Sequence, residues 1–172
     1  MFTRYVTASF LLLLAAVSAS AATVRGEDLT TYRNARHGYM ISYPTELFEL
    51  DPANESEDGR MLVSRDGRAR LLMGAFENDE KMSLDAYRSF LIERNYGGAK
   101  IDYAPVRPRW FVVSGERDGT VFYERVTFTC GGRLINSWAL LYPAAEKRRF
   151  DQLVEQVSRS YTAGAGAKGT CD

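Results

Sequence analysis

The chain has 172 residues, with 22 Lys and Arg against 22 Asp and Glu, one His and two Cys. This neutral balance argues against binding of nucleic acid or of an anionic membrane surface, because both need a surplus of basic residues. About 150 residues follow an apolar N-terminal segment, enough for one domain with a real core and too few for two.

The N-terminus has the pattern of a cleavable signal peptide. Arg4 precedes an apolar run over residues 5–17, and small residues follow it. The run is shorter than the ~20 residues of a membrane-spanning helix, and cleavage near Ala21 or Ala22 fits the small-x-small rule; an uncleaved anchor is the alternative. We therefore expect a secreted or periplasmic protein that is not an integral membrane protein. The expected segments are a signal peptide (1–22), a linker (23–30), one domain (31–162) and a flexible tail (163–172).

Short strands and turns fill the next part of the chain. Two strands are predicted around a turn at residues 36–38, followed by about one helical turn over 45–50. The pair Asp66-Gly67 predicts a hairpin between strands over 60–64 and 68–76, because it supplies the positive backbone angles of a tight turn.

A helix is predicted to start after Ser83, which suits an N-cap position. Tyr87 and Leu91 share the apolar side that faces a sheet, and Gly97 and Gly98 permit a left-handed end. A strand over 99–106 follows.

Residues 110–143 predict a β-meander of three runs joined by two glycine turns. The first turn is Asp118-Gly119 and the second spans 130–132. In the middle run, Phe122, Val126 and Phe128 share one face that Glu124 interrupts. The third run, 134–142, is apolar on both faces, as expected for a central strand covered on both sides.

The last predicted element is an amphipathic helix over 144–161. Its core stripe consists of Phe150, Leu153, Val154, Val157 and Tyr161. Together these elements predict an α+β class, an antiparallel β-sheet of about six or seven strands flanked by helices.

Both cysteines, Cys130 and Cys171, lie after the apolar segment. In an exported chain we expect them to form a disulfide that ties the tail to the second turn of the meander. The alternative is a buried core thiol at Cys130 and a free tail thiol at Cys171.

No catalytic or cofactor motif occurs, and no cofactor is expected. His37 stands beside Gly38, and we expect an exposed turn histidine there; a hydrolase-type enzyme using His37, Glu124 or Asp118 remains a less favoured alternative. The acidic stretch 51–59 is expected to be a solvated loop, since its spacing does not fit an EF-hand. Its weak metal candidates are Asp51, Asn54, Glu57 and Asp58.

Basic side chains gather near predicted turns, together with one tryptophan. If they converge, they form a site for a carboxylate, a phosphate or a protein partner; the alternative is that they keep strand edges soluble. The candidate binding residues are Arg65, Arg68, Arg107, Arg109, Arg117 and Trp110.

The domain opens with the motif Tyr32-x-Asn34-x-x-x-Gly38-Tyr39-x-Ile41-x-Tyr43-Pro44, and the hairpins, the meander and the closing helix follow. This arrangement resembles the PsbP-like and Mog-type superfamily, including its branch of exported bacterial proteins. The resemblance covers about residues 32–161. It implies an α/β/α sandwich and a non-catalytic accessory or binding protein that engages a protein partner in the cell envelope. The alternative is a binder of a small anionic ligand or a metal ion, through the arginines or the 51–59 stretch.

Overall fold

A computed structural model describes residues 29–171. The expected signal peptide, its cleavage sites and residues 23–28 lie outside the described residues. The strands and helices are β1 (Leu29–Arg33), β2 (Met40–Pro44), β3 (Phe48–Glu55), β4 (Gly59–Ser64), β5 (Arg70–Glu77), α1 (Leu84–Tyr96), β6 (Lys100–Tyr103), β7 (Val106–Arg107), β8 (Trp110–Arg117), β9 (Thr120–Thr129), β10 (Leu134–Pro143) and α2 (Lys147–Ser160), with 3₁₀ turns at Cys130–Gly132 and Ala144–Glu146.

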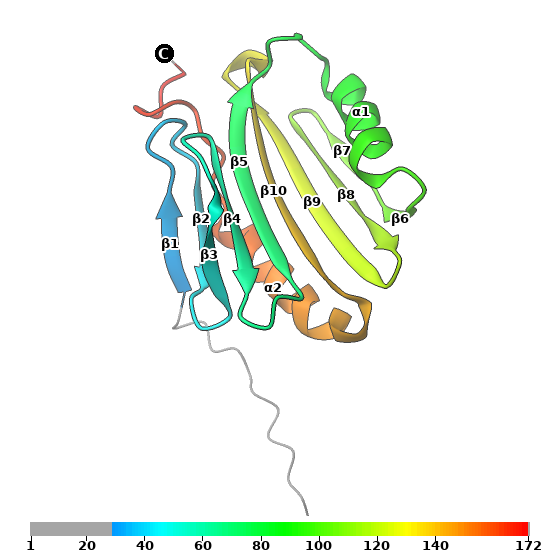
Figure 1. The fold of residues 1–172 in the computed structure, drawn as a ribbon. Helices are drawn as coiled ribbons and strands as arrows, with labels where there is room; N and C mark the ends of the chain where they lie inside the picture. Colours follow the sequence, from blue (N-terminus) through cyan, green and yellow to red (C-terminus); the bar gives the residue numbers. More distant parts are fainter. Residues whose placement is uncertain (1–28, 172) are drawn as a thin grey trace, which may run out of the picture.

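One large antiparallel sheet organises the described chain. Its strand order is β3-β4-β5-β10-β9-β8-β6, with β7 also paired to β8, while β1 and β2 form a separate hairpin (Figure 1). This confirms the predicted α+β class. The sheet has eight strands because residues 48–55 form a further strand and the run expected over 99–106 divides into β6 and β7.

The meander is confirmed, with β10 in the middle of the sheet between β5 and β9. Asp118 and Gly119 make the β8–β9 turn with φ of 51° and 75°, the backbone that a two-residue turn of this kind requires. Trp138 and Leu140 are fully buried on one face of β10, while Ile135 packs on the other.

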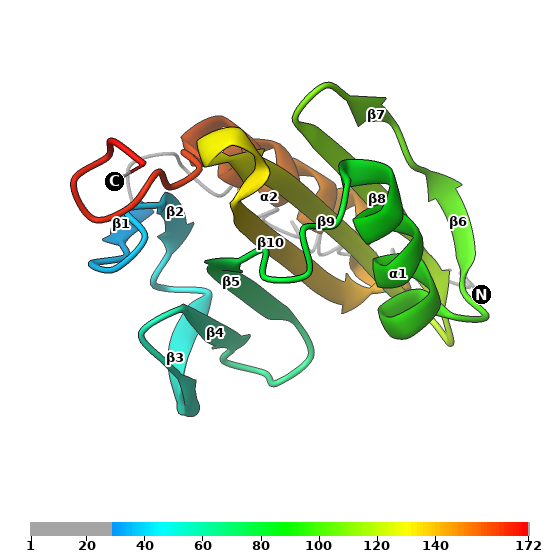
Figure 2. The ribbon, with the colours of Figure 1, turned by 90° about the horizontal axis from the view of Figure 1, so that it is seen from above.

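A helix lies on each side of the sheet (Figure 2). Ser83 caps α1 as predicted, its Oγ accepting from the Ala86 amide at 3.2 Å. On α2, Phe150, Leu153, Val154 and Val157 of the predicted stripe are buried against the opposite face, which also carries the β1–β2 hairpin. Tyr161, the last residue of that stripe, follows the end of α2 and is partly buried. No helix within residues 29–171 has the length and apolar content to cross a membrane.

Strand β3 corrects two expectations, the helical turn over 45–50 and the acidic loop over 51–59. Phe48 is buried and pairs with Ser64 of β4, which holds this segment extended. Beyond it most side chains of β3 are exposed, because β3 is an edge strand. Charged residues are common on sheet edges, so the composition resembled that of a loop.

His37 is a second correction, because it is buried, with 4% of its surface exposed. Its Nε2 lies 2.7 Å from Asp58 Oδ1, and the Gly166 amide donates to its carbonyl oxygen at 3.0 Å. The tail thus packs across the turn that holds His37, a contact between distant parts of the chain that no local pattern indicates.

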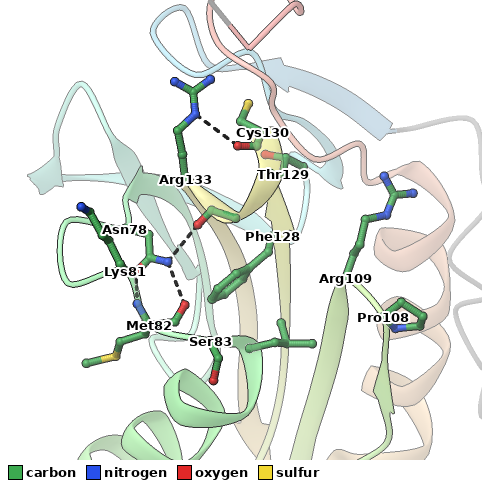
Figure 3. A pocket seen from close by; sticks show the side chains of 13 residues that line it. Asn78, Lys81, Met82, Ser83, Pro108, Arg109, Phe128, Thr129, Cys130 and Arg133 are labelled. Carbon is green, nitrogen blue, oxygen red and sulfur yellow. Dashed lines mark hydrogen bonds between the residues drawn. The ribbon is translucent and has the colours of Figure 1, made fainter.

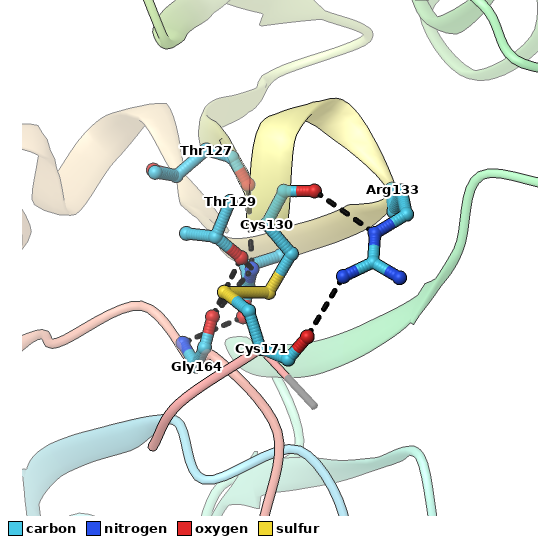
Figure 4. Close-up of a disulfide and its surroundings, with 7 residues drawn as sticks. Thr127, Thr129, Cys130, Arg133, Gly164 and Cys171 are labelled. Atoms are coloured by element: carbon cyan, nitrogen blue, oxygen red, sulfur yellow. Dashed lines mark hydrogen bonds between the residues drawn. A yellow bond between two sulfur atoms is a disulfide. The ribbon is translucent and has the colours of Figure 1, made fainter.

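The predicted disulfide between Cys130 and Cys171 is present (Figure 4). Hydrogen bonds hold the same segment: the Gly164 amide donates to Asn136 Oδ1 at 2.8 Å, and Thr129 Oγ1 donates to the Gly164 carbonyl at 2.6 Å. Arg133 donates to the Cys171 carbonyl at 2.7 Å. The tail up to residue 171 is therefore fixed along the top of the sheet.

Replacing both cysteines by serine is expected to lower the free energy of unfolding by about 3 to 4 kcal/mol, the loop-entropy value for a closed loop of about 40 residues. Urea unfolding of the two proteins, each with and without reductant, measures this. Reductant should destabilise the wild type to the level of the double variant and leave that variant unchanged. Equal midpoints for the oxidised wild type and the variant would contradict the prediction.

Candidate functional site

The sheet face that carries α1 is only partly covered. Figure 1 shows α1 in front of β8, while β5 and β10 have no helix in front of them. Small side chains, Gly74 of β5 with Ser137 and Ala139 of β10, leave a hollow between larger neighbours. This hollow, the α1 groove, has a volume of about 610 Å³. Its walls include Met61, Leu72, Phe76, Tyr87, Leu91, Tyr96, Glu124 and Leu141.

Glu124 of β9 lies at the floor of the α1 groove and is 6% exposed. The Tyr96 hydroxyl donates to its Oε2 and the Ser137 hydroxyl to its Oε1, each at 2.6 Å. Contacts of this length are typical of hydroxyls that donate to an ionised carboxylate. Each oxygen retains capacity to accept a further hydrogen bond.

The charge on Glu124 is costly. Burial raises the pKa of this carboxyl above its ordinary value, and the two hydroxyl donors offset only part of that effect. Within residues 29–171 no cation forms an ion pair with Glu124. Arg60 also lines the groove, but its guanidinium pairs with Glu55 and lies 4.2 Å from the centre of the Tyr32 ring.

The pKa values of two tyrosines of α1, Tyr87 and Tyr96, are also shifted by burial and by the nearby Glu124. Burial, with a smaller effect from the Glu124 charge, raises the pKa of Tyr87 to about 12. Burial and then Glu124 raise the pKa of Tyr96 in the same direction. Both phenols therefore stay protonated at neutral pH, and Tyr96 remains a hydrogen-bond donor to Glu124.

The rim of the groove is apolar and open. Leu72 is 36% and Phe76 40% exposed. The ring of Phe76 lies 6.1 Å from that of Tyr87, which in turn lies 6.1 Å from that of Phe90. Large exposed apolar side chains that gather around a hollow mark a binding surface more often than chance exposure does.

The arginines predicted as a site are distributed over several places. Arg65 lies in the β4–β5 turn and donates to the carbonyls of Glu46 and Thr45, between β2 and β3. Arg68, in the same turn, forms ion pairs with Asp66 and Glu146. At the β8–β9 turn Arg117 donates to the Gly97 carbonyl. These three guanidiniums are occupied by contacts within the chain.

The remaining candidates lie near the β7–β8 turn. The guanidiniums of Arg107 and Arg125 lie 5.8 Å and 4.6 Å from the Trp110 ring. Arg109 instead lines a separate cavity of about 590 Å³ with Lys81 and Arg133 (Figure 3). None of the six residues lines the α1 groove.

The acidic candidates for a metal do not converge. Asp51 accepts from Asn54 at 2.8 Å, while Glu57 and Asp58 both pair with Arg36. Over residues 29–171 no group of three or more His, Cys, Asp and Glu is placed to hold a metal ion.

The sequence contains a signal for Glu124 that no catalytic motif includes. Glu124 is the one charged side chain at an inward position of β9, between Phe122 and Val126. A charge at such a position needs partners in the fold. The side-chain partners of Glu124 are Tyr96 and Ser137. His37, another residue of the hydrolase alternative, instead contacts Asp58, so these two residues share no hydrogen-bond partner.

Glu124→Gln is expected to stabilise the protein more at high pH than at low pH. Below about pH 4.5, the ordinary value for this group, the carboxyl is protonated in both states and its burial carries no charge penalty. As the pH rises through the raised pKa, the folded state loses stability relative to the unfolded state. The gain in Tm of the variant should therefore grow between pH 4 and pH 8, to on the order of a few degrees.

Thermal unfolding followed by circular dichroism across that pH range measures the difference. Glu93→Gln, on the exposed side of α1, is the matched control and should show no such trend. A variant whose advantage shrinks as the pH rises would contradict the prediction.

Comparison with known proteins identifies the fold. No family model and no curated protein matches the chain. The solution structure of cyanobacterial PsbP (CyanoP) from Synechocystis sp. PCC 6803 superimposes with a TM-score of 0.58 at 14% identity, covering 84% of this chain and 97% of that one. A crystal structure from Bacteroides thetaiotaomicron has a TM-score of 0.41 at 17% identity over 73% of this chain and 44% of that one. The chain therefore has a PsbP-like fold, as the order of its elements and the motif from Tyr32 to Pro44 predicted together.

Proposed function

We propose that this protein is an exported, non-catalytic binding protein that holds a segment of a protein partner in the α1 groove. The observation that carries the proposal is the groove itself, an open apolar hollow with exposed Leu72 and Phe76 at its rim and a polar floor at Glu124. Apolar contact area with a few fixed polar groups is the usual composition of a recognition site.

Export is supported by two independent features. The N-terminal sequence has the pattern of a signal peptide, and Cys130 and Cys171 form a disulfide. Disulfides persist in oxidising compartments such as the periplasm or the extracellular space. The PsbP-like fold fits an accessory protein, an argument from analogy that adds to the groove and does not replace it.

The alternative ligands find less support. Arg65, Arg68 and Arg117 are occupied by contacts within the chain. The floor of the α1 groove carries a carboxylate, which would repel a small anion. A protein segment with apolar side chains fits the walls of the groove better than an anion or a metal ion does.

Leu72→Asp and Phe76→Asp are each expected to reduce capture of the partner at least tenfold, because a charge would be buried under the bound segment. Wild type and variants are immobilised and exposed to an envelope extract of the host, and the bound proteins are quantified by mass spectrometry. Both side chains are half-exposed, so circular dichroism should show unchanged folding.

Tyr103→Asp is the matched control, since Tyr103 is 58% exposed on β6, outside the groove. It should capture the same proteins as the wild type. Equal capture by all four proteins would show that the groove is not the binding surface.

A further inference from the structure

We propose that Glu124 anchors a cationic side chain, a lysine ammonium or an arginine guanidinium, carried by the partner segment that fills the α1 groove. This inference rests on the proposed function and adds the chemistry of the bound group. Its basis is a buried carboxylate that faces a cavity and has hydroxyl donors without a counter-charge.

The hydrogen bonds around Glu124 favour its ionised form, against the burial that raises the pKa of this carboxyl. Tyr96 and Ser137 each approach one carboxylate oxygen at 2.6 Å. Hydroxyls at this distance can donate to a carboxylate, and such hydrogen bonds stabilise its charged form. The two hydroxyls orient the carboxylate and leave it able to accept from a group that enters the groove.

Among residues 29–171, the surroundings of Glu124 supply no compensating charge in contact with it. The groups that face it are Tyr87 and Tyr96 from α1 and Ser137 from β10, all uncharged at neutral pH, with Arg60 of β4 across the groove held by Glu55. Buried charges in proteins are normally paired, because an isolated buried charge loses its hydration and gains no interaction that compensates for the loss. A cation from outside the chain would restore that balance.

The walls of the groove also favour a cation on an apolar stem. Phe76 and Tyr87 present aromatic rings beside the hollow, and ring faces attract ammonium and guanidinium groups. The methylene chain of lysine or arginine packs well on apolar side chains such as Leu72 and Leu91. A hard metal ion would need several oxygen ligands, and Glu124 is the one carboxylate among the groove residues.

The test uses n-butylammonium, which reproduces the lysine side chain, with n-butanol and n-butyrate as neutral and anionic probes of the same length. Each is titrated into the ¹⁵N-labelled mature protein at pH 7 and constant ionic strength, and amide shifts are followed by NMR. We expect butylammonium to shift the amides of Leu72, Leu91 and Ser137 in a saturable way. Its apparent Kd should be at least tenfold lower than that of butanol, and butyrate should not bind there.

Glu124→Gln keeps the shape of the side chain and one accepting oxygen, but removes the charge and replaces the other oxygen with a donating NH₂ group. In this variant butylammonium and butanol should bind equally. Ser137→Ala keeps the charge and should retain a preference for the cation. Equal binding of ammonium and alcohol to the wild type, or an ammonium preference that survives Glu124→Gln, would overturn the inference.

The partner capture described above separates this inference from the proposed function. If Leu72→Asp and Phe76→Asp lose the partner while Glu124→Gln retains it, the groove binds the partner without a cationic anchor. If Glu124→Gln loses the partner as fully as the rim variants, both statements hold. If none of these three variants changes the capture of the partner, the groove is not the binding surface. The proposed function and the cationic anchor would then both be wrong.

Discussion

The width of one helix against a broad sheet is the constraint on which this structure depends. An α-helix with its side chains is ~10 Å across, and neighbouring strands are ~4.8 Å apart, so one helix covers about two strands. On the face that carries α1, this coverage extends over the β8 side of the sheet and leaves β4, β5 and part of β10 open. The opposite face has α2, the β1–β2 hairpin and the tail, and is closed.

Because the two faces of the sheet are covered differently, the two faces of β10 carry different kinds of side chain. Towards α2 the strand presents Trp138, Leu140 and Tyr142, which are buried and form the larger core. Towards α1 it presents Ser137 and Ala139, whose small side chains make room for the groove and for Glu124. A large core on one face permits an unfavourable buried charge on the other, because stability is a small sum of large contributions.

The parts of the fold that depend on neighbouring residues could be predicted from the sequence. The Asp-Gly turn at Asp118, the cap at Ser83 and the stripe of α2 follow from backbone preference and periodicity. The two cysteines, which follow a signal-peptide pattern, predicted their own disulfide. The edge strand β3, the burial of His37 and the groove arise from contacts between distant segments, which one sequence does not display. The arginines were the more conspicuous pattern, but Arg65 and Arg68 make contacts within the chain, and the single inward charge at Glu124 lies in the α1 groove instead.

The energetic cost of Glu124 has a consequence for how this protein would change under selection. Variants that replace an unfavourable buried carboxylate with a neutral or apolar side chain are among the easiest stabilising changes to find in a folded protein. A selection for thermal resistance alone should therefore remove this carboxylate early and leave the Cys130–Cys171 bond in place. Persistence of the acid under such pressure would indicate that the cell requires the binding chemistry more than it requires the extra stability.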